Sequence, residues 1–178
     1  MKQKNMQQTT DPRMKTFGII AVVAIIIGAI FIFSGNKDEN KAESEGTPKL
    51  KVAETRYDFG DISMKDGLAT HNFVIENEGD GVLKFSAMET SCMCTSVILD
   101  VNGKRSPKFG MAGMGTNPRG WSGEILPGES ANLEVIFDPN AHGPEATGPI
   151  TRVVTIETND GGRKKTTKEF TFTANVTK

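Results

Sequence analysis

Seventeen consecutive residues near the start of the chain, 17–33, include no polar side chain. As a helix they would span about 25 Å, and with Thr16, Ser34 and Gly35 they become long enough for the ~30 Å hydrocarbon core of a bilayer. A helix buried in a protein core would keep a polar face, and this run has none. It therefore predicts an uncleaved single-pass transmembrane helix over residues 16–35, with a cleaved signal peptide as the alternative.

The charges on either side of the apolar run predict its orientation. Residues 1–15 contain four basic side chains and one acidic side chain, whereas both signs are mixed after the run. Basic residues that flank a membrane helix stay on its cytoplasmic side. We therefore expect residues 1–15 to form a cytoplasmic tail, and the C-terminal part to lie outside the cytoplasmic membrane, in the periplasm or at the cell surface. Residues 36–50 are polar, which predicts a flexible linker before a globular domain at 51–178.

Beyond residue 50 the dominant pattern is an alternation of apolar and polar side chains in short runs. The runs lie at 70–77, 83–88, 132–137, 154–157 and 170–176. The expected buried sides are Phe73 with Ile75, Leu83 with Phe85 and Ala87, Leu133 with Val135 and Phe137, Val154 with Ile156, and Phe170 with Phe172, Ala174 and Val176. Gly, Asn and Asp stand between the runs, and no apolar stripe of helical period follows residue 50. This pattern predicts an all-β domain, an antiparallel β-sandwich.

Two stretches interrupt the alternation. Residues 102–123 contain six glycines and two prolines, and residues 139–149 are also rich in Gly and Pro. Loops as long as the first are uncommon in compact domains and are often functional. We expect Trp121, the single tryptophan, to plug one end of the sandwich rather than to stand exposed as an anchor for a partner.

The order of the motifs resembles a known family. The motifs are Tyr57-Asp-Phe-Gly-Asp-Ile62, His71-Asn-Phe-Val-Ile-Glu-Asn77 with Gly79, Ser91-Cys-Met-Cys-Thr95, Leu126-Pro-Gly-Glu129, Val135-Ile-Phe-Asp138 and Thr155-Ile-Glu-Thr-Asn159. Over about residues 52–176 they are similar to the bacterial domain-of-unknown-function family 1573, which is immunoglobulin-like and similar to Hydin-type and major-sperm-protein-like domains. The resemblance implies an immunoglobulin-like sandwich and an exported or anchored module without established catalysis. Met93 stands where the family usually has glycine.

Cys92 and Cys94 are the only cysteines, and the predicted compartment permits disulfides. In an extended strand their Cα atoms would lie nearly 7 Å apart, so a bridge needs a bend that Met93 does not ease. Three interpretations stay open: a strained or conditional disulfide, two inert buried thiols, or a metal site. Two thiolates together with the thioethers of Met93, Met111 and Met114 would form a Cu(I) site, because soft sulfur favours that ion.

Catalytic patterns are missing from the sequence. His71 is expected at a core edge and His142 in a solvated loop, and neither has the spacing of a metalloprotease or a catalytic triad. A net charge of -1 argues against a nucleic-acid partner. We therefore expect that the protein is not an enzyme, that it has no cofactor, and that it is a membrane-anchored module that binds or scaffolds an unidentified protein. The alternative is a copper-binding or thiol-redox role for the Cys-Met-Cys segment.

Overall fold

The computed structural model describes residues 46–115, 117–162 and 164–178. The predicted cytoplasmic tail, the predicted transmembrane helix and most of the linker lie outside these residues. Within the residues described, no helix combines the length and apolar character needed to cross a membrane. The last linker residues lie against the domain, because Pro48 is buried and the Thr47 amide donates to Asp80 at 2.7 Å.

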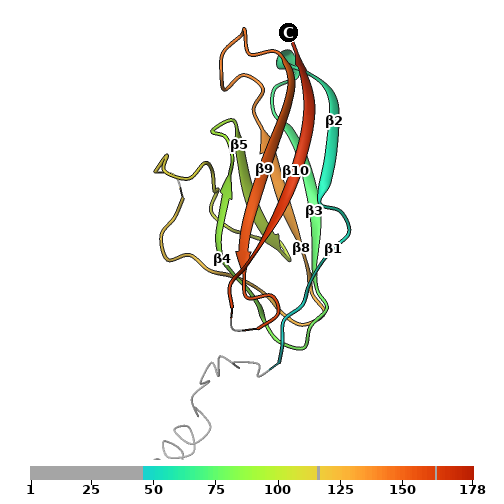
Figure 1. Cartoon of the computed structure of the whole chain (residues 1–178), viewed down its shortest axis with the longest axis vertical. Coiled ribbons are helices and arrows are strands. Elements are labelled where there is room, and N and C mark those ends of the chain that lie inside the picture. The colour runs from blue at the N-terminus through green and yellow to red at the C-terminus, as the bar shows by residue number, and fades with distance from the viewer. Residues whose placement is uncertain (1–45, 116, 163) are drawn as a thin grey trace, which may run out of the picture. The chain divides into compact units, whose positions relative to one another are not determined.

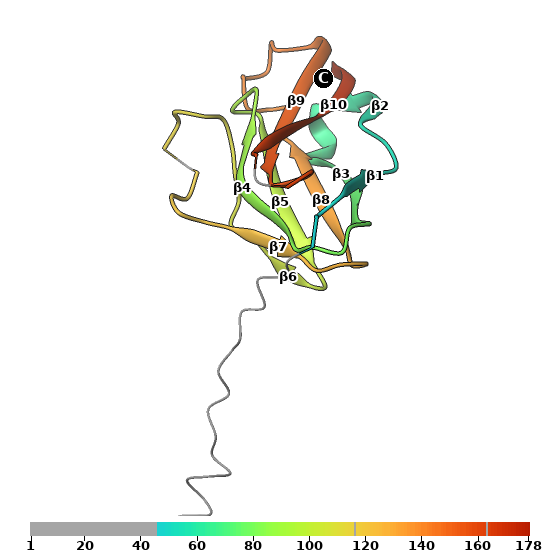
Figure 2. The ribbon, with the colours of Figure 1, turned by 60° about the horizontal axis from the view of Figure 1, so that its bottom comes forward.

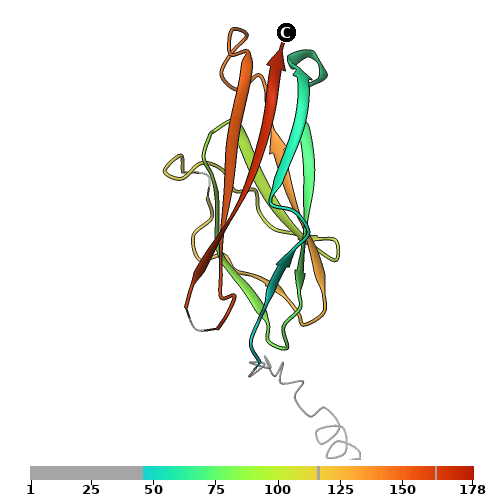
Figure 3. The same cartoon turned by 45° about the vertical axis from the view of Figure 1, so that its right-hand side comes forward.

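The described part of the chain forms two five-stranded sheets packed face to face, which confirms the predicted β-sandwich (Figure 1, Figure 3). The first sheet has the order β1 (Leu50–Val52), β3 (Ala69–Asn77), β8 (Ser130–Phe137), β5 (Thr95–Val101) and β6 (Lys104–Arg105). The second has the order β2 (Arg56–Ser63), β10 (Thr166–Thr177), β9 (Gly148–Thr158), β4 (Leu83–Thr90) and β7 (Gly123–Ile125). A single turn of 3-10 helix, η1 (Met64–Asp66), follows β2.

One strand pair departs from the predicted antiparallel arrangement. β2 runs parallel to β10, whereas the other paired strands of the described residues are antiparallel. A parallel pair needs a long connection, and here most of the domain separates the two strands. Two side-chain hydrogen bonds reinforce the pair: Thr173 donates to Asp58, and Asn175 donates to Asp61, both at 2.8 Å.

The core lies between the sheets and is built from the alternating strands. Phe73, Ile75, Leu133, Val135, Phe170 and Ile156 are all fully buried, as the alternation predicts. β4 is the exception, because its register against β9 shifts between Phe85 and Ala87. After this bulge the faces exchange, so Ala87 is exposed and Met88 is buried. The predicted inward position of Ala87 is therefore wrong.

Asn77 ties the end of β3 to three neighbouring segments. Its side chain is buried and donates to the carbonyls of Gly81 and Ile125 at 2.8 and 3.0 Å, and it accepts from the amide of Lys49. Gly79 lies so close to residues 47–49 that a Cβ there would come within 2.2 Å of the Thr47 carbonyl oxygen. The packing of this turn therefore explains the Asn and the Gly of the family-like motif.

The loop segments at 106–115 and 117–122 lie at the side of the sandwich where β4 and β5 run (Figure 2). Phe109 pairs with Val97 and is buried, and Met111 pairs with Thr90. Trp121 packs on Phe109, with ring centroids 4.8 Å apart, and is partly buried against the core. Trp121 therefore packs against the core rather than standing exposed as an anchor, in a loop at the side of the sandwich. The loop thereby connects to both sheets, and part of it forms a surface beside the cysteine segment.

Candidate functional site

The two cysteines lie in the tight turn that carries the chain from β4 in one sheet to β5 in the other. The Thr95 amide donates to the Cys92 carbonyl at 3.1 Å, and the Thr90 hydroxyl is within 3.0 Å of the Thr95 carbonyl oxygen. This turn brings the two cysteine Cα atoms to 5.3 Å, within the usual range for a bridge, and the structure records a disulfide between them. The turn therefore supplies the bend that a bridge needs, and of the three interpretations the structure has the disulfide.

Met93 occupies the tip of this turn without backbone strain. Among the described residues other than glycine, only Asn102 has a positive φ, so the bend does not require glycine at position 93. The Met93 side chain is 54% exposed. The expectation that Met93 opposes the bend is thus wrong, because the turn uses ordinary backbone angles.

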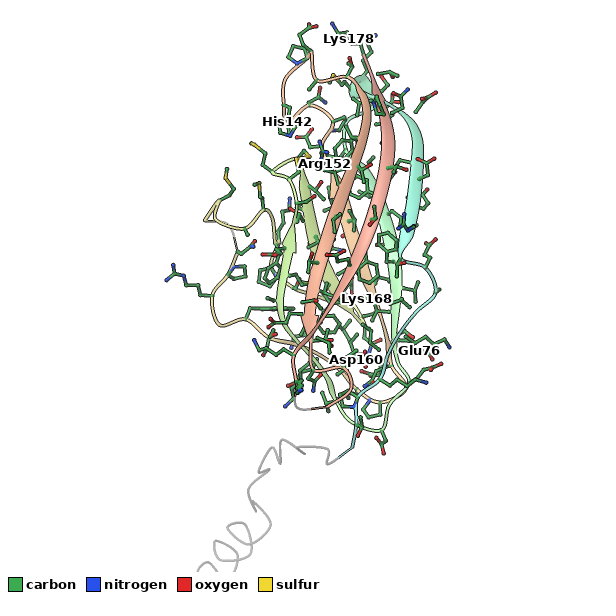
Figure 4. All side chains as sticks on the ribbon, in the orientation of Figure 1. Glu76, His142, Arg152, Asp160, Lys168 and Lys178 are labelled. Atoms are coloured by element: carbon green, nitrogen blue, oxygen red, sulfur yellow. A yellow bond between two sulfur atoms is a disulfide. The ribbon has the colours of Figure 1, made fainter. Side chains whose placement is uncertain are left out.

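Two side chains that were not predicted as site residues contact the cysteine sulfurs. His142 Nε2 lies 3.1 Å from Cys92 Sγ, and Arg152 Nε donates to Cys94 Sγ at 3.1 Å. Figure 4 shows His142 and Arg152 toward the same end of the domain, opposite to Asp160 and Glu76. We call Cys92, Cys94, His142 and Arg152 the cysteine site.

The loop between β8 and β9 positions His142. Asn140 Nδ2 donates to the Met64 carbonyl at 2.9 Å, and the Gly143 amide donates to the Asn140 carbonyl at 3.0 Å. His142 is exposed on a loop, as expected, but it also has a specific partner. Because 50 residues separate it from Cys92, nothing in the local sequence indicates that contact.

Burial differs between the two cysteines. Cys94 is 2% exposed, whereas Cys92 is partly exposed and packs at the edge of the core. The Cys94 carbonyl accepts from the Asp138 amide at 2.8 Å, which fixes the turn against the end of β8. Cys92 is therefore the sulfur that a reagent or ligand from solvent reaches first.

The predicted methionines gather beside the cysteine site, in a groove of about 710 Å³. Its apolar wall includes Leu68, Met93, Met111 and Met114, and Cys94 lines it as well. Neither Cys92 nor His142 lines this groove. Met88, by contrast, is a buried core residue. We call the surface formed by Leu68, Met93, Met111 and Met114 the methionine groove.

His71, the other histidine, has a structural role. Its ring stacks on Tyr57 with centroids 3.5 Å apart, and its Nε2 lies 2.9 Å from Glu54. This confirms the expected position at the core edge.

Comparison with solved structures supports the fold. The chain resembles a protein of unknown function from Porphyromonas gingivalis W83, with 19% identity, a TM-score of 0.53 and coverage of 79% of this chain. The match covers 51% of the other protein, so this chain spans about half of its length. At this identity the likeness shows the β-sandwich fold alone.

Other solved structures are more distant. The PapD-like domain 7 of human CEP192 matches with 12% identity and a TM-score of 0.45, over 74% of this chain and 87% of that domain. The E. coli chaperone DraB matches with 9% identity and a TM-score of 0.43, over 72% of this chain and 55% of its own.

A comparison with curated proteins finds no match. A family profile does match, over residues 50–103, which run from β1 through the cysteine turn to the end of β5. The predicted resemblance is therefore confirmed for this span: residues 50–103 match the family described as protein of unknown function DUF1573.

Proposed function

We propose that this protein is a membrane-anchored, extracytoplasmic β-sandwich module that binds another protein through the methionine groove and catalyses no reaction. One observation carries the proposal. In the described residues six large hydrophobic side chains are exposed, and four of them line this single groove. Scattered apolar residues are normal on a surface, but a cluster of this kind marks an interaction site.

The groove favours an apolar segment of a protein partner. Its four exposed large apolar side chains come from three separate parts of the chain, and three of the four are methionines. Methionine is flexible and polarizable, so such a surface adapts to apolar side chains of different shapes. Lys108 and Asp138 at the groove offer one charge of each sign for the ends or the backbone of that segment.

Crosslinking in cells tests this surface. A photoreactive residue is placed at Met114, which is 54% exposed in the groove, or at Leu126, which is 50% exposed and does not line it. We expect one discrete protein adduct from position 114 and none from position 126. Equal adducts at both positions, or none at position 114, would contradict the proposal.

The proposed anchor and orientation rest on the apolar run at 17–33 and on the basic residues before it. Protease added to intact spheroplasts should degrade the β-sandwich domain and leave the N-terminal tail protected. A protected domain would contradict the proposed location, whatever the crosslinking experiment shows.

A second candidate function, copper binding or thiol redox chemistry, is favoured by a different observation. A histidine nitrogen and an arginine nitrogen each lie 3.1 Å from one of the two cysteine sulfurs. Thiol titration of the purified protein after mild reduction, with and without Cu(I), tests this candidate. Two titratable thiols that copper protects would support it, and thiols that stay unreactive or unprotected would oppose it.

A further inference from the structure

Three potential metal ligands converge at the cysteine site from two segments that are distant in sequence. The sulfurs of Cys92 and Cys94 and a ring nitrogen of His142 all lie within 4.8 Å of one another. Three ligands around one ion, with metal–sulfur bonds of ~2.3 Å at angles of ~120°, would lie roughly 4 Å apart. The three donor atoms are therefore neighbours already, but the two sulfurs are bonded to each other here and must separate before they can surround an ion.

The surroundings also balance the charge of such an ion. Two thiolates and one monovalent cation carry a net charge of minus one. Arg152 Nε already points at Cys94 Sγ, and its Nη1 donates to the Thr151 carbonyl at 2.8 Å, which holds the guanidinium in place. A fixed guanidinium beside a thiolate stabilises the charged form.

We propose that the reduced protein binds one Cu(I) ion through the thiolates of Cys92 and Cys94 and Nε2 of His142, with Arg152 as the positioning residue that offsets the charge. The inference rests on the second candidate function and is independent of protein binding in the methionine groove. It adds His142 to the sulfur ligands expected from the sequence and removes Met93, Met111 and Met114 from them.

The position of the methionines argues against them as primary ligands of the ion. Met111 and Met114 line the groove on one side of the cysteine turn, and the groove's lining does not include Cys92 or His142. His142 and Arg152 instead line a separate pocket with Phe137 and Ile150. Of the three proposed ligands, only Cys94 lines the methionine groove.

The disulfide has to open before the ion binds. Two molecules of a small thiol each supply one electron and one proton, which yields the protein dithiol and one small-molecule disulfide. Cu(I) then displaces the two thiol protons and forms two metal–sulfur bonds. The oxidised protein, whose sulfurs are bonded to each other, should not bind the ion.

The donor set favours Cu(I) over Zn(II). Two soft thiolates and one imidazole complete a three-coordinate site for Cu(I), whereas Zn(II) would need a fourth ligand, such as water, in addition to these three. Structural zinc sites also usually space their cysteines by two to four residues, and here only Met93 lies between them.

The test is a competition titration of the full chain in detergent, reduced and handled without oxygen, against the Cu(I) chelator bathocuproine disulfonate. We expect one Cu(I) per chain, and an X-ray absorption spectrum with two sulfur neighbours and one nitrogen neighbour. Since loss of an outer-shell partner already costs about 10–100-fold in metal affinity, His142→Ala, which removes a ligand, should weaken binding at least tenfold. His71→Ala is the matched control and should leave the affinity unchanged.

The remaining variants separate this site from its alternatives. Cys92→Ser should weaken Cu(I) binding by more than His142→Ala does, and the variant with leucine at positions 93, 111 and 114 should bind as the wild type does. Any one of three results would overturn the inference. They are wild-type Cu(I) affinity in His142→Ala, a loss of Cu(I) affinity in the leucine variant alone, and tighter binding of Zn(II) than of Cu(I). The crosslinking experiment is unaffected by each of these results, so failure of this site and failure of the proposed groove function are distinguishable.

Discussion

In β8 and in residues 170–176 of β10 every second side chain is buried, and the residue types along each strand determine which face that is. At the cysteine site, by contrast, the contacts join residues 50 and 58 positions apart, from the β4–β5 turn, a loop and β9. The strands therefore form the framework of the domain, whereas the geometry of the site depends on where that framework places its loops. Substitutions in the first region should therefore lower stability, and substitutions in the second should lower binding.

The largest expected effect concerns the framework. Phe172 is 1% exposed and packs against Phe59 and Phe137, so Phe172→Ala should lower the free energy of unfolding by about 3–5 kcal/mol. Urea unfolding of the purified protein measures the change. Val74→Ala, on the exposed face of β3, serves as control and should cost less than about 0.5 kcal/mol. A loss below about 1 kcal/mol for Phe172→Ala would contradict the assigned buried face.

A smaller loss of folding stability is expected from a substitution in the turn after β3. Asn77→Ala leaves the buried carbonyls of Gly81 and Ile125 without their side-chain donor, and we expect a cost of about 2–4 kcal/mol. The same urea measurement on Asn72→Ala, an exposed position of the same strand, should give a value near zero. Equal effects of the two variants would mean that the hydrogen bonds of Asn77 do not stabilise the turn.

The cysteine bridge should stabilise the fold less than the core does. It closes a loop of three residues, for which the chain-entropy model gives about 1–2 kcal/mol. Replacement of both cysteines by serine should lower the free energy of unfolding by that amount. Met93→Gly should cost less than about 1 kcal/mol, because position 93 has ordinary backbone angles. A loss of several kcal/mol in the free energy of unfolding of the cysteine-free variant would contradict this prediction, and would show that the bridge stabilises the fold as the core does.

The smallest effect is on acid stability. Hydrogen bonds from Lys51 and Lys49 lower the pKa of Glu78, and those from Lys165 and Ser86 lower the pKa of Glu157. A carboxyl whose folded pKa is depressed stabilises the fold above its unfolded pKa, and this stability is lost as the pH falls through the folded value. The thermal midpoint should therefore decrease slightly below about pH 4. Glu78→Gln should reduce that decrease, and a midpoint that rises below pH 4 would contradict the assignment.

The same comparison explains what the sequence could predict. β3, β8 and β10 follow the period-2 alternation, and their buried faces were predictable. β5 was not, because Val97, Ile98 and Leu99 are buried in succession and the alternation is missing. In β4 the bulge before Ala87 reverses the faces, and a bulge has no fixed local signature.

For the candidate site, the cysteines and methionines were accessible from the sequence, but His142 and Arg152 were not. A lone histidine in a Gly- and Pro-rich loop and an arginine in a strand carry no local signal of a shared contact. Their contacts to the cysteines exist only because the β8–β9 loop and β9 meet the β4–β5 turn in the folded domain.

The central claim, that the loop-built end of the domain binds a protein partner, is tested most directly by one affinity measurement. The partner crosslinked at position 114 is purified, and its dissociation constant is measured for the wild type, Met114→Asp and Leu126→Asp. A charge in the apolar groove, which a bound partner would desolvate, should weaken binding at least tenfold, which is about 1.4 kcal/mol, whereas the same charge at position 126 should have no effect. Equal affinities for the two variants would contradict the claim.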